Sequence, residues 1–391
     1  MPNARFDQRA GQVLRTLEET GQLKPFYTLL GPLGATAQIE GHGEVIVLCS
    51  NNYLGLASDP EVVAAGIEGL RQYGAGTASV RFICGTLACH RELEAAIASL
   101  VSTEAALSYT SCYAANEAVF PTLVAPDDAI FSDELNHASL IDSIRLVDRR
   151  VPREVYRHAD LADLEQRLKA HAQATCRWVV TDGVFSMEGD VAPLPELVAL
   201  CRQYEAVLVV DDSHGVGVLG EKGRGSPEHF GLSGQIDILT GTLGKALGGA
   251  AGGYVAASEQ VIRLLAQRSR PSLFSNALPA TVATSARRAI GLLLAQPQRL
   301  ARLRANVQHL RQGLRALGYT VHDSPTAIVP ILIGDEAETL AKSRRLLELG
   351  VLVIGFGYPV VPKGQARLRL QVSAALEEEH LKRVLDAFAR L

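Results

Sequence analysis

The sequence predicts an α/β protein with a mainly parallel central sheet and a smaller α+β domain at the C-terminal end. Short apolar runs alternate with helical patterns between residues 106 and 256, which is typical of a parallel sheet covered by helices. After residue 297 the pattern changes to a long helix followed by a few strands and helices. A chain of 391 residues also exceeds one small core, so we expect two domains.

The first 45 residues indicate a helical lead-in and a connecting segment. Leu14 and Leu17 are loosely spaced, and Pro25 ends the helix. An apolar run at residues 45–48 predicts a short strand that leads into Asn51. Paired asparagines after a strand are common in turns, and they also present amide groups to ligands.

The middle of the chain predicts six strands and the helices between them. Leu93, Ile97 and Leu100 have helical spacing, so we expect a helix over residues 90–100. A second helix is expected from about residue 110 to 123, and a long helix follows residues 269–279. The predicted strands are 106–109, 129–132, 178–181, 207–210, 238–240 and 254–256.

The C-terminal part begins at Gln296 and Pro297, where we place a domain boundary. Leucine and valine then recur every three or four residues from Leu300 to Leu317, which predicts a strongly amphipathic helix. Strands are expected at 327–333, 351–354 and 367–372. The predicted domains are therefore residues 1–45, 46–295 and 296–391.

Composition excludes several classes of protein. The net charge of −4 gives no nucleic-acid footprint, and no apolar run is long enough to span a bilayer. Residues 1–12 lack the apolar stretch of a secretory signal, so we expect a cytoplasmic protein. The six cysteines include no C-x-x-C pair, which indicates reduced thiols and no metal site.

A glycine-rich stretch at residues 237–254 surrounds one lysine, Lys245. Glycines allow tight turns and close approach to a ligand. A phosphate-binding P-loop needs glycine and Ser or Thr where this chain has Leu239 and Ala246, so that interpretation fails. Alone, the window fits an ordinary loop lysine nearly as well as a lysine that forms an imine.

The strand at residues 207–210 ends in Asp211, Asp212 and His214. Ligands in open α/β sheets bind at the carboxyl ends of strands, so these side chains should face a site together with Thr242 and Lys245. A lysine for a Schiff base and an aspartate for a pyridine nitrogen are what pyridoxal 5′-phosphate (PLP) requires. Each residue alone has a simpler explanation, such as a helix cap for the aspartate.

Other residues fit the same site, although each has an ordinary structural role as its alternative. Ser111 and Cys112 open a helix whose N-terminus could bind phosphate. His137 follows a strand and could stack on a flat ring. Arg367 and Arg369 are two apart on a strand and therefore point the same way, so one could hold a carboxylate. The segment 74–86 suggests a tight loop near a ligand or a subunit contact.

Together, several segments resemble the α-oxoamine synthases, a family of fold-type-I PLP enzymes, over nearly the whole chain from about residue 15. The segments that carry the resemblance are SNNYLGL (50–56), SVRFICGT (79–86), SDELNHASLIDSIRL (132–146), TDGVFSMEGD (181–190), VDDSHGVGVLG (210–220), TGTLGKALGG (240–249), RSRPSLFSN (268–276) and YPVVPKGQARLRL (358–370).

The resemblance implies an aspartate-aminotransferase-like fold, a homodimer with shared active sites, and a role for each matching residue. Lys245 would carry the Schiff base and act as acid and base, Asp211 would pair with the pyridine nitrogen and His214 with the ring hydroxyl. His137 would stack on the ring. The remaining implied contacts are Ser186 near the ring, Ser111, Cys112, Tyr113 and Thr242 at the phosphate, Ser275 at the phosphate of the neighbouring subunit, and Arg369 with Asn51 at the substrate carboxylate.

Within the family, the segments at 81–86, 269–276 and 358–367 resemble members that condense glycine with acetyl-CoA to 2-amino-3-oxobutanoate. The alternatives are L-alanine with a pimeloyl thioester, or a broader range of acyl-CoAs. Gly357 stands where acetyl-specific members often carry an aromatic residue, so we expect it to enlarge the acyl pocket. Two other classes stay open, an aminotransferase and a binding protein without activity, although the intact set of Lys245, Asp211 and His214 argues against the latter.

Overall fold

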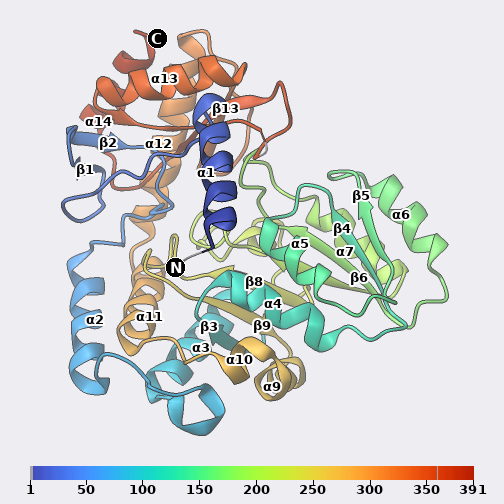
Figure 1. The fold of residues 1–391 in the computed structure, drawn as a ribbon. Coiled ribbons are helices and arrows are strands. Elements are labelled where there is room, and N and C mark those ends of the chain that lie inside the picture. The colour runs from blue at the N-terminus through green and yellow to red at the C-terminus, as the bar shows by residue number, and fades with distance from the viewer. Residues whose placement is uncertain (1–2, 359) are drawn as a thin grey trace.

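A seven-stranded mixed sheet forms the centre of the computed structural model, which describes residues 3–358 and 360–391 (Figure 1). Pro359, within one segment of the resemblance, and residues 1–2 of the expected lead-in lie outside the described residues. In spatial order the strands are β3 (Ala105–Tyr109), β9 (Gly253–Ala257), β8 (Ile238–Thr242), β7 (Ala206–Asp211), β6 (Arg177–Asp182), β4 (Ala129–Asp133) and β5 (Arg153–Tyr156).

Most of this sheet is parallel, as predicted. The neighbours β5, β4, β6, β7 and β8 all run parallel, while β9 is antiparallel to both β8 and β3. The sequence prediction missed β5. That edge strand has only one buried residue among its four, so it carries no apolar run.

Helices cover both faces of the sheet. Alternate strand residues point to opposite sides, and apolar residues on both sides need to be covered. Val180 and Val209 contribute to the core beneath α4 and α5, whereas Val179, Leu208 and Val210 join the larger core that continues into the C-terminal part. The helices of this region are α2 (Pro60–Tyr73), α3 (Ala88–Val101), α4 (Cys112–Leu123), α5 (Ala138–Arg145), α6 (Leu161–Ala170), α7 (Leu194–Gln203), α8 (Ser226–His229), α9 (Glu259–Arg268), α10 (Arg270–Phe274) and α11 (Ala280–Ala295).

The C-terminal part is a smaller α+β unit, also as predicted. A long helix, α12, follows α11 directly and crosses from the large sheet to this unit (Figure 1). Its antiparallel sheet has the order β10-β13-β12. The elements are α12 (Pro297–Ala316), β10 (Ile328–Gly334), α13 (Glu336–Glu348), β12 (Ile354–Phe356), β13 (Ala366–Gln371) and α14 (Glu378–Phe388).

Residues near the two ends of the chain share a third, small sheet. β1 (Thr36–Ile39) pairs with β2 (Gly43–Val47), and β2 pairs in parallel with β11 (Val351–Leu352). The predicted strand at 351–354 is therefore divided between two sheets. The N-terminal helix α1 (Ala4–Glu19) has no buried residue. The division into residues 1–45, 46–295 and 296–391 stays a prediction.

No helix within residues 3–358 and 360–391 combines the length and the apolar character needed to cross a membrane.

Candidate active site

The carboxyl ends of the parallel strands surround a cavity of about 220 Å³, where ligands of open α/β sheets bind. Nearly all of the predicted cofactor-site residues meet there. The lining residues are Cys112, Tyr113, His137, Ser139, Asp182, Val184, Ser186, Asp211, Ser213, His214, Thr242 and Lys245.

Lys245 lies in the glycine-rich turn between β8 and β9. Among the described residues, no group accepts or donates a hydrogen bond at its amine. Burial lowers the pKa of Lys245, and the negative charge of Asp211 opposes that shift only in part. A larger share of the amine is therefore neutral near pH 7 than for an exposed lysine, which favours a nucleophile or a base.

Asp211 ends β7 and is almost fully buried. Its carboxylate accepts hydrogen bonds from Nδ2 of Asn116 at 2.8 Å and from the backbone N–H of Ser213 at 3.0 Å. The Cys112 thiol lies 3.6 Å from the same carboxylate. Asn116 was not predicted as a site residue. Its place one helical turn after Cys112, on the same face of α4, was the signal that could have found it.

Asp212, in contrast, does not face the cavity, so the expectation for it was wrong. Successive strand residues point to opposite faces, and Asp212 directly follows Asp211. Its carboxylate accepts from the backbone N–H of Ser226 at 2.8 Å and from the Ser226 hydroxyl at 2.7 Å. Burial raises the pKa of Asp212 to about 7.

His214 is the end of a hydrogen-bond chain that the sequence did not reveal. Arg369 donates to Oε1 of Gln371 at 3.1 Å, and Gln371 donates through Nε2 to the Tyr53 hydroxyl at 2.9 Å. The Tyr53 oxygen lies 2.8 Å from Nδ1 of His214. Burial raises the pKa of Tyr53 to about 12, so its hydroxyl keeps the proton.

This chain fixes the tautomer of His214. Burial, followed by the charge of Lys245, lowers the pKa of His214 well below its ordinary value, so the ring is neutral. Since Tyr53 accepts from Gln371, it donates to Nδ1 of His214. The proton of the neutral ring is then on Nε2, which can donate a hydrogen bond to an oxygen in the cavity.

His137 lies between β4 and α5 and is placed by a second aspartate. Its backbone N–H donates to Oδ2 of Asp182 at 3.0 Å, and its Nδ1 lies 2.8 Å from the Ser139 hydroxyl. Burial lowers the pKa of His137. Burial and the charge of Asp211 raise the pKa of Asp182 well above its ordinary value. Asp182 was not predicted; its place directly after a buried strand was the available signal.

The first residues of α4, Cys112 and Tyr113, lie at one edge of the cavity. The Ser111 hydroxyl caps the helix by accepting from the N–H of Ala114 at 3.0 Å, and Ser111 itself does not line the cavity. The Thr242 hydroxyl accepts from the N–H of Gly244 and donates to the carbonyl of Gly252. Free N–H groups in the first turn of a helix favour a phosphate group.

The two arginines of β13 face one direction, as predicted, but only one has donors to spare. Arg367 is buried and is held by the carbonyl of Met187 at 3.1 Å and by Glu188 at 3.0 Å. Arg369 donates to the carbonyl of Ser186 at 2.9 Å, and its buried Nε has no partner among the described residues. The Arg369 guanidinium is therefore the one suited to an incoming carboxylate.

Three further sequence-based expectations concern residues outside the cavity. Asn51 accepts from Gln371 and so contacts the partner of Arg369. Ser275 is exposed and does not line the cavity of its own chain. Gly357 does not line the cavity, and a Cβ atom there would lie 3.0 Å from Cγ of Glu336 on α13; its effect on an acyl pocket stays a prediction.

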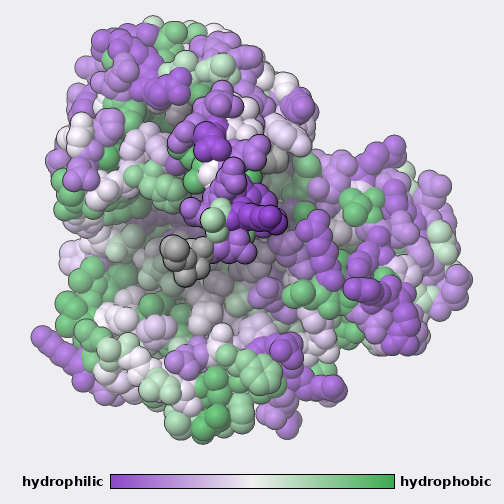
Figure 2. Space-filling model, in the orientation of Figure 1, coloured by the Kyte–Doolittle hydropathy of each residue, from purple (hydrophilic) through white to green (hydrophobic). Residues whose placement is uncertain are grey.

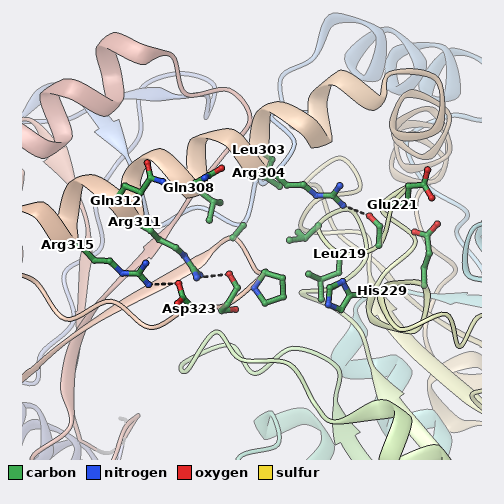
Figure 3. A pocket seen from close by; sticks show the side chains of 17 residues that line it. Leu219, Glu221, His229, Leu303, Arg304, Gln308, Arg311, Gln312, Arg315 and Asp323 are labelled. Carbon is green, nitrogen blue, oxygen red and sulfur yellow. Dashed lines mark hydrogen bonds and ion pairs between the residues drawn. The ribbon is translucent and has the colours of Figure 1, made fainter.

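A larger cavity of about 750 Å³ lies elsewhere, between α12 and residues 218–229 (Figure 3). Three arginines of α12 line it, but protein groups engage them. Arg304 donates to the carbonyl of Gly220, Arg315 pairs with Asp323, and Arg311 binds four carbonyls between residues 322 and 328. None of the predicted site residues lines this cavity.

The smaller cavity and the fold define a class of protein. A family model described as aminotransferase class I and II matches residues 43–388, and the chain belongs to that family. The structure also matches that of SPT with a PLP internal aldimine, with a TM-score of 0.93 and 31% identity over 99% of this chain and 97% of that one. The protein is thus a fold-type-I enzyme that uses PLP as its cofactor.

More specific similarities come from curated relatives. The chain is 44% identical to the 2-amino-3-ketobutyrate coenzyme A ligase of Escherichia coli K12, over 99% of this chain and 97% of the relative. It is 44% identical to the mitochondrial enzyme of that name from mouse, over 97% and 91%. The 8-amino-7-oxononanoate synthase of Symbiobacterium thermophilum is also 44% identical, over 97% and 96%.

Proposed function

We propose that this enzyme condenses glycine with acetyl-CoA to give 2-amino-3-oxobutanoate and CoA. The observation that carries the proposal is the near-full-length identity of 44–45% to 2-amino-3-ketobutyrate coenzyme A ligases from both bacteria and mammals. The cavity supports it, because a lysine with a lowered pKa and a buried carboxylate line one space, and Arg369 lies beside that space, bound to the carbonyl of the lining residue Ser186.

The residues around the cavity fit PLP by their chemistry. Lys245 would hold the aldehyde carbon, Asp211 the pyridine nitrogen, and Nε2 of His214 the ring oxygen. His137 would lie against the ring. The remaining contacts would be Ser186 near the ring and Ser111, Cys112, Tyr113 and Thr242 near the phosphate. When bound, PLP supplies an electron sink that stabilises negative charge on the amino-acid Cα.

The chain's own residues then select and activate glycine. Arg369, helped by Asn51 through Gln371, would bind the glycine carboxylate. The Lys245 amine would take a proton from the glycine Cα, a role that suits its lowered pKa. A bond then forms between that Cα and the acetyl carbonyl carbon, the C–S bond breaks, and the sulfur leaves with its electron pair and is protonated to CoA.

A second candidate function uses the same residues with L-alanine and a pimeloyl thioester. The observation that supports it is the 44% identity to the Symbiobacterium thermophilum 8-amino-7-oxononanoate synthase, which equals the identity to the Escherichia coli ligase.

We further propose a homodimer in which Ser275 completes the partner's site. Phe82, Ile83 and Phe274 are exposed at 63%, 67% and 71%, and the bridge between Val80 and Asn276 holds their segments together. Figure 2 shows apolar side chains on the part of the surface where Figure 1 draws α2, α3 and α10. A second copy of the chain packed on this surface would remove these apolar side chains from water, which stabilises a dimer.

A cytoplasmic location is also proposed, from the bacterial relatives and the free cysteines. The mouse relative is mitochondrial, so a compartment within an organelle is the alternative. Fractionation of the source cells with an antibody against the chain would separate the two.

The activity is tested by CoA release. Purified protein loaded with PLP is mixed with glycine or L-alanine and with acetyl-CoA or pimeloyl-CoA, and free thiol is titrated. We expect the fastest release with glycine and acetyl-CoA, and none from the Lys245→Ala variant. Release only with L-alanine and pimeloyl-CoA would establish the second candidate. Bound cofactor without CoA release from any pair would point to aminotransferase chemistry.

A further inference from the structure

The loop of residues 183–191, here the 183–191 loop, lies between β6 and α7 and contacts the C-terminal unit through several of its residues. The carbonyl of Ser186 accepts from Arg369 at 2.9 Å, and the carbonyl of Met187 accepts from Arg367 at 3.1 Å. The carbonyl of Gly189 accepts from the Thr326 hydroxyl at 2.7 Å. The loop therefore provides one of the contacts that place the Arg369 guanidinium, beside those with Gln371 and Phe356.

His158 holds the next residue of the loop from the opposite side. Its Nε2 lies 2.8 Å from Oδ2 of Asp190, and its Nδ1 lies 3.0 Å from Oδ1 of Asp133. Asp133 is buried at the end of β4 in the large sheet. The Phe185 ring meets the His158 ring edge-on, with centroids 4.4 Å apart.

The geometry requires His158 to carry two ring protons, because each nitrogen faces a carboxylate that can only accept. Burial lowers the pKa of His158, but the hydrogen bonds to Asp133 and Asp190 outweigh it and raise the pKa to about 10. The charged ring therefore links the large sheet to the loop throughout the physiological pH range.

We propose that His158 is a positioning residue: it fixes the 183–191 loop to the large sheet, so that the loop holds Arg369 where the substrate carboxylate binds. His158 does not line the cavity, so it acts on the substrate only through the loop. The part of the inference that concerns the carboxylate rests on the proposed function, whereas the part that concerns the loop does not.

The test compares two histidine variants of the PLP-loaded enzyme. His158→Gln removes the doubly bonded cation. His171→Gln is the matched control, because His171 also contacts a carboxylate, Glu154, at 3.1 Å and an aromatic ring, Phe131, but lies outside the cavity and the loop. Amide hydrogen exchange of residues 183–191 and 366–371 is measured, and glycine binding is followed by the absorbance change of the bound cofactor.

In His158→Gln we expect faster exchange in both segments. The glycine dissociation constant should rise about tenfold, because a displaced Arg369 would lose about one charge-assisted hydrogen bond to the glycine carboxylate. His171→Gln should match the wild type in both measurements. Unchanged exchange in His158→Gln would overturn the proposal, and so would faster exchange with unchanged glycine affinity. If the wild type shows no spectral response to glycine, the proposed function fails while the exchange result still decides the role in the loop.

Asp190→Asn provides a second variant in case His158→Gln does not fold. It keeps the contact between His158 and Asp133 inside the large sheet and weakens only the link to the loop. The same rise in exchange and in the glycine dissociation constant is expected, and wild-type values for both would contradict the proposal.

Discussion

Two adjacent aspartates at the end of β7 have different roles, one at the candidate site and the other in holding the fold together. Asp211 faces the cavity beside Lys245, while Asp212 faces inward to Ser226. The two side chains have the same chemistry, and both are buried. Only the alternation of strand residues, continued into the following turn, assigns them to different roles.

The first prediction uses this pair. Asp211→Asn should lower kcat by a factor of about 100 or more with little loss of stability, because a neutral amide cannot hold a protonated pyridine nitrogen. Asp212→Asn should lower the free energy of unfolding but leave kcat near the wild-type value. Steady-state CoA release and urea denaturation of both variants check this. Equal losses of kcat in the two variants would contradict the assignment.

The second prediction concerns pH and His158. Its pKa is about 10 in the fold and about 6.5 in an unfolded chain. A group whose pKa is raised by folding contributes stability that is fully present below pH 6.5 and lost as the pH rises toward 10. The charged groups that face it are Asp133 and Asp190 at the ring and Glu134 at its backbone N–H.

The free energy of unfolding of the wild type should therefore exceed that of His158→Gln by about 1–3 kcal/mol at pH 6, and the difference should shrink toward pH 10. Urea denaturation at several pH values measures it, with His171→Gln as the control. A difference that stays constant from pH 6 to pH 10 would show that the ring charge does not stabilise the fold.

At the scale of elements, helix packing in the large unit depends on small residues. α2 and α11 lie side by side (Figure 1), and Gly69 of α2 faces Thr284 of α11. A Cβ atom at Gly69 would lie 2.9 Å from Cγ2 of Thr284 and 3.0 Å from the carbonyl oxygen of Ala280. The two helices could not keep their separation with a larger residue there.

The third prediction follows from this contact. Gly69→Ala should lower the free energy of unfolding by about 1–3 kcal/mol, because the added methyl group overpacks the interface. Gly291→Ala is the matched control in α11, where a Cβ atom meets no other atom within 4 Å. That variant should gain up to about 1 kcal/mol from helix propensity. Chemical denaturation checks both, and a stabilised Gly69→Ala would show that the helices move apart at no cost.

At the scale of the whole molecule, the candidate site is incomplete within one chain if Ser275 serves the partner. Ser275 is exposed beside the apolar surface formed by Phe82, Ile83 and Phe274. A site shared between two chains makes activity depend on which chain carries which residue.

The fourth prediction tests this dependence by mixing two inactive variants, Lys245→Ala and Ser275→Arg. A mixed dimer would keep one intact site, with Lys245 from one chain and Ser275 from the other. After unfolding and refolding the mixture, roughly one quarter of the wild-type activity should return, since half the dimers are mixed and each has one working site. Each variant refolded alone is the control, and no recovery in the mixture would show that Ser275 does not complete the site of the partner chain.

The sequence by itself determined that the central sheet is mainly parallel, that Asp211, His214 and Lys245 lie at or just after the ends of buried strands, and that the cofactor is PLP. These depend on local patterns: a buried strand is apolar throughout, and the polar residues that follow it must lie at the sheet edge. For the same reason the edge strands β1 and β5, which have few buried residues, left no pattern to find.

Only the tertiary structure decided the supporting contacts. The hydrogen bonds in question join Asn116 to Asp211, Asp182 to Asn136, and Gln371 to Tyr53. The paired residues are 46 to 318 positions apart, and no spacing in the sequence encodes such pairs. The orientation of Asp212, the different contacts of Arg367 and Arg369, and the link from His158 to the 183–191 loop have the same origin. Each depends on how separate strand ends and loops pack together, which the fold as a whole sets.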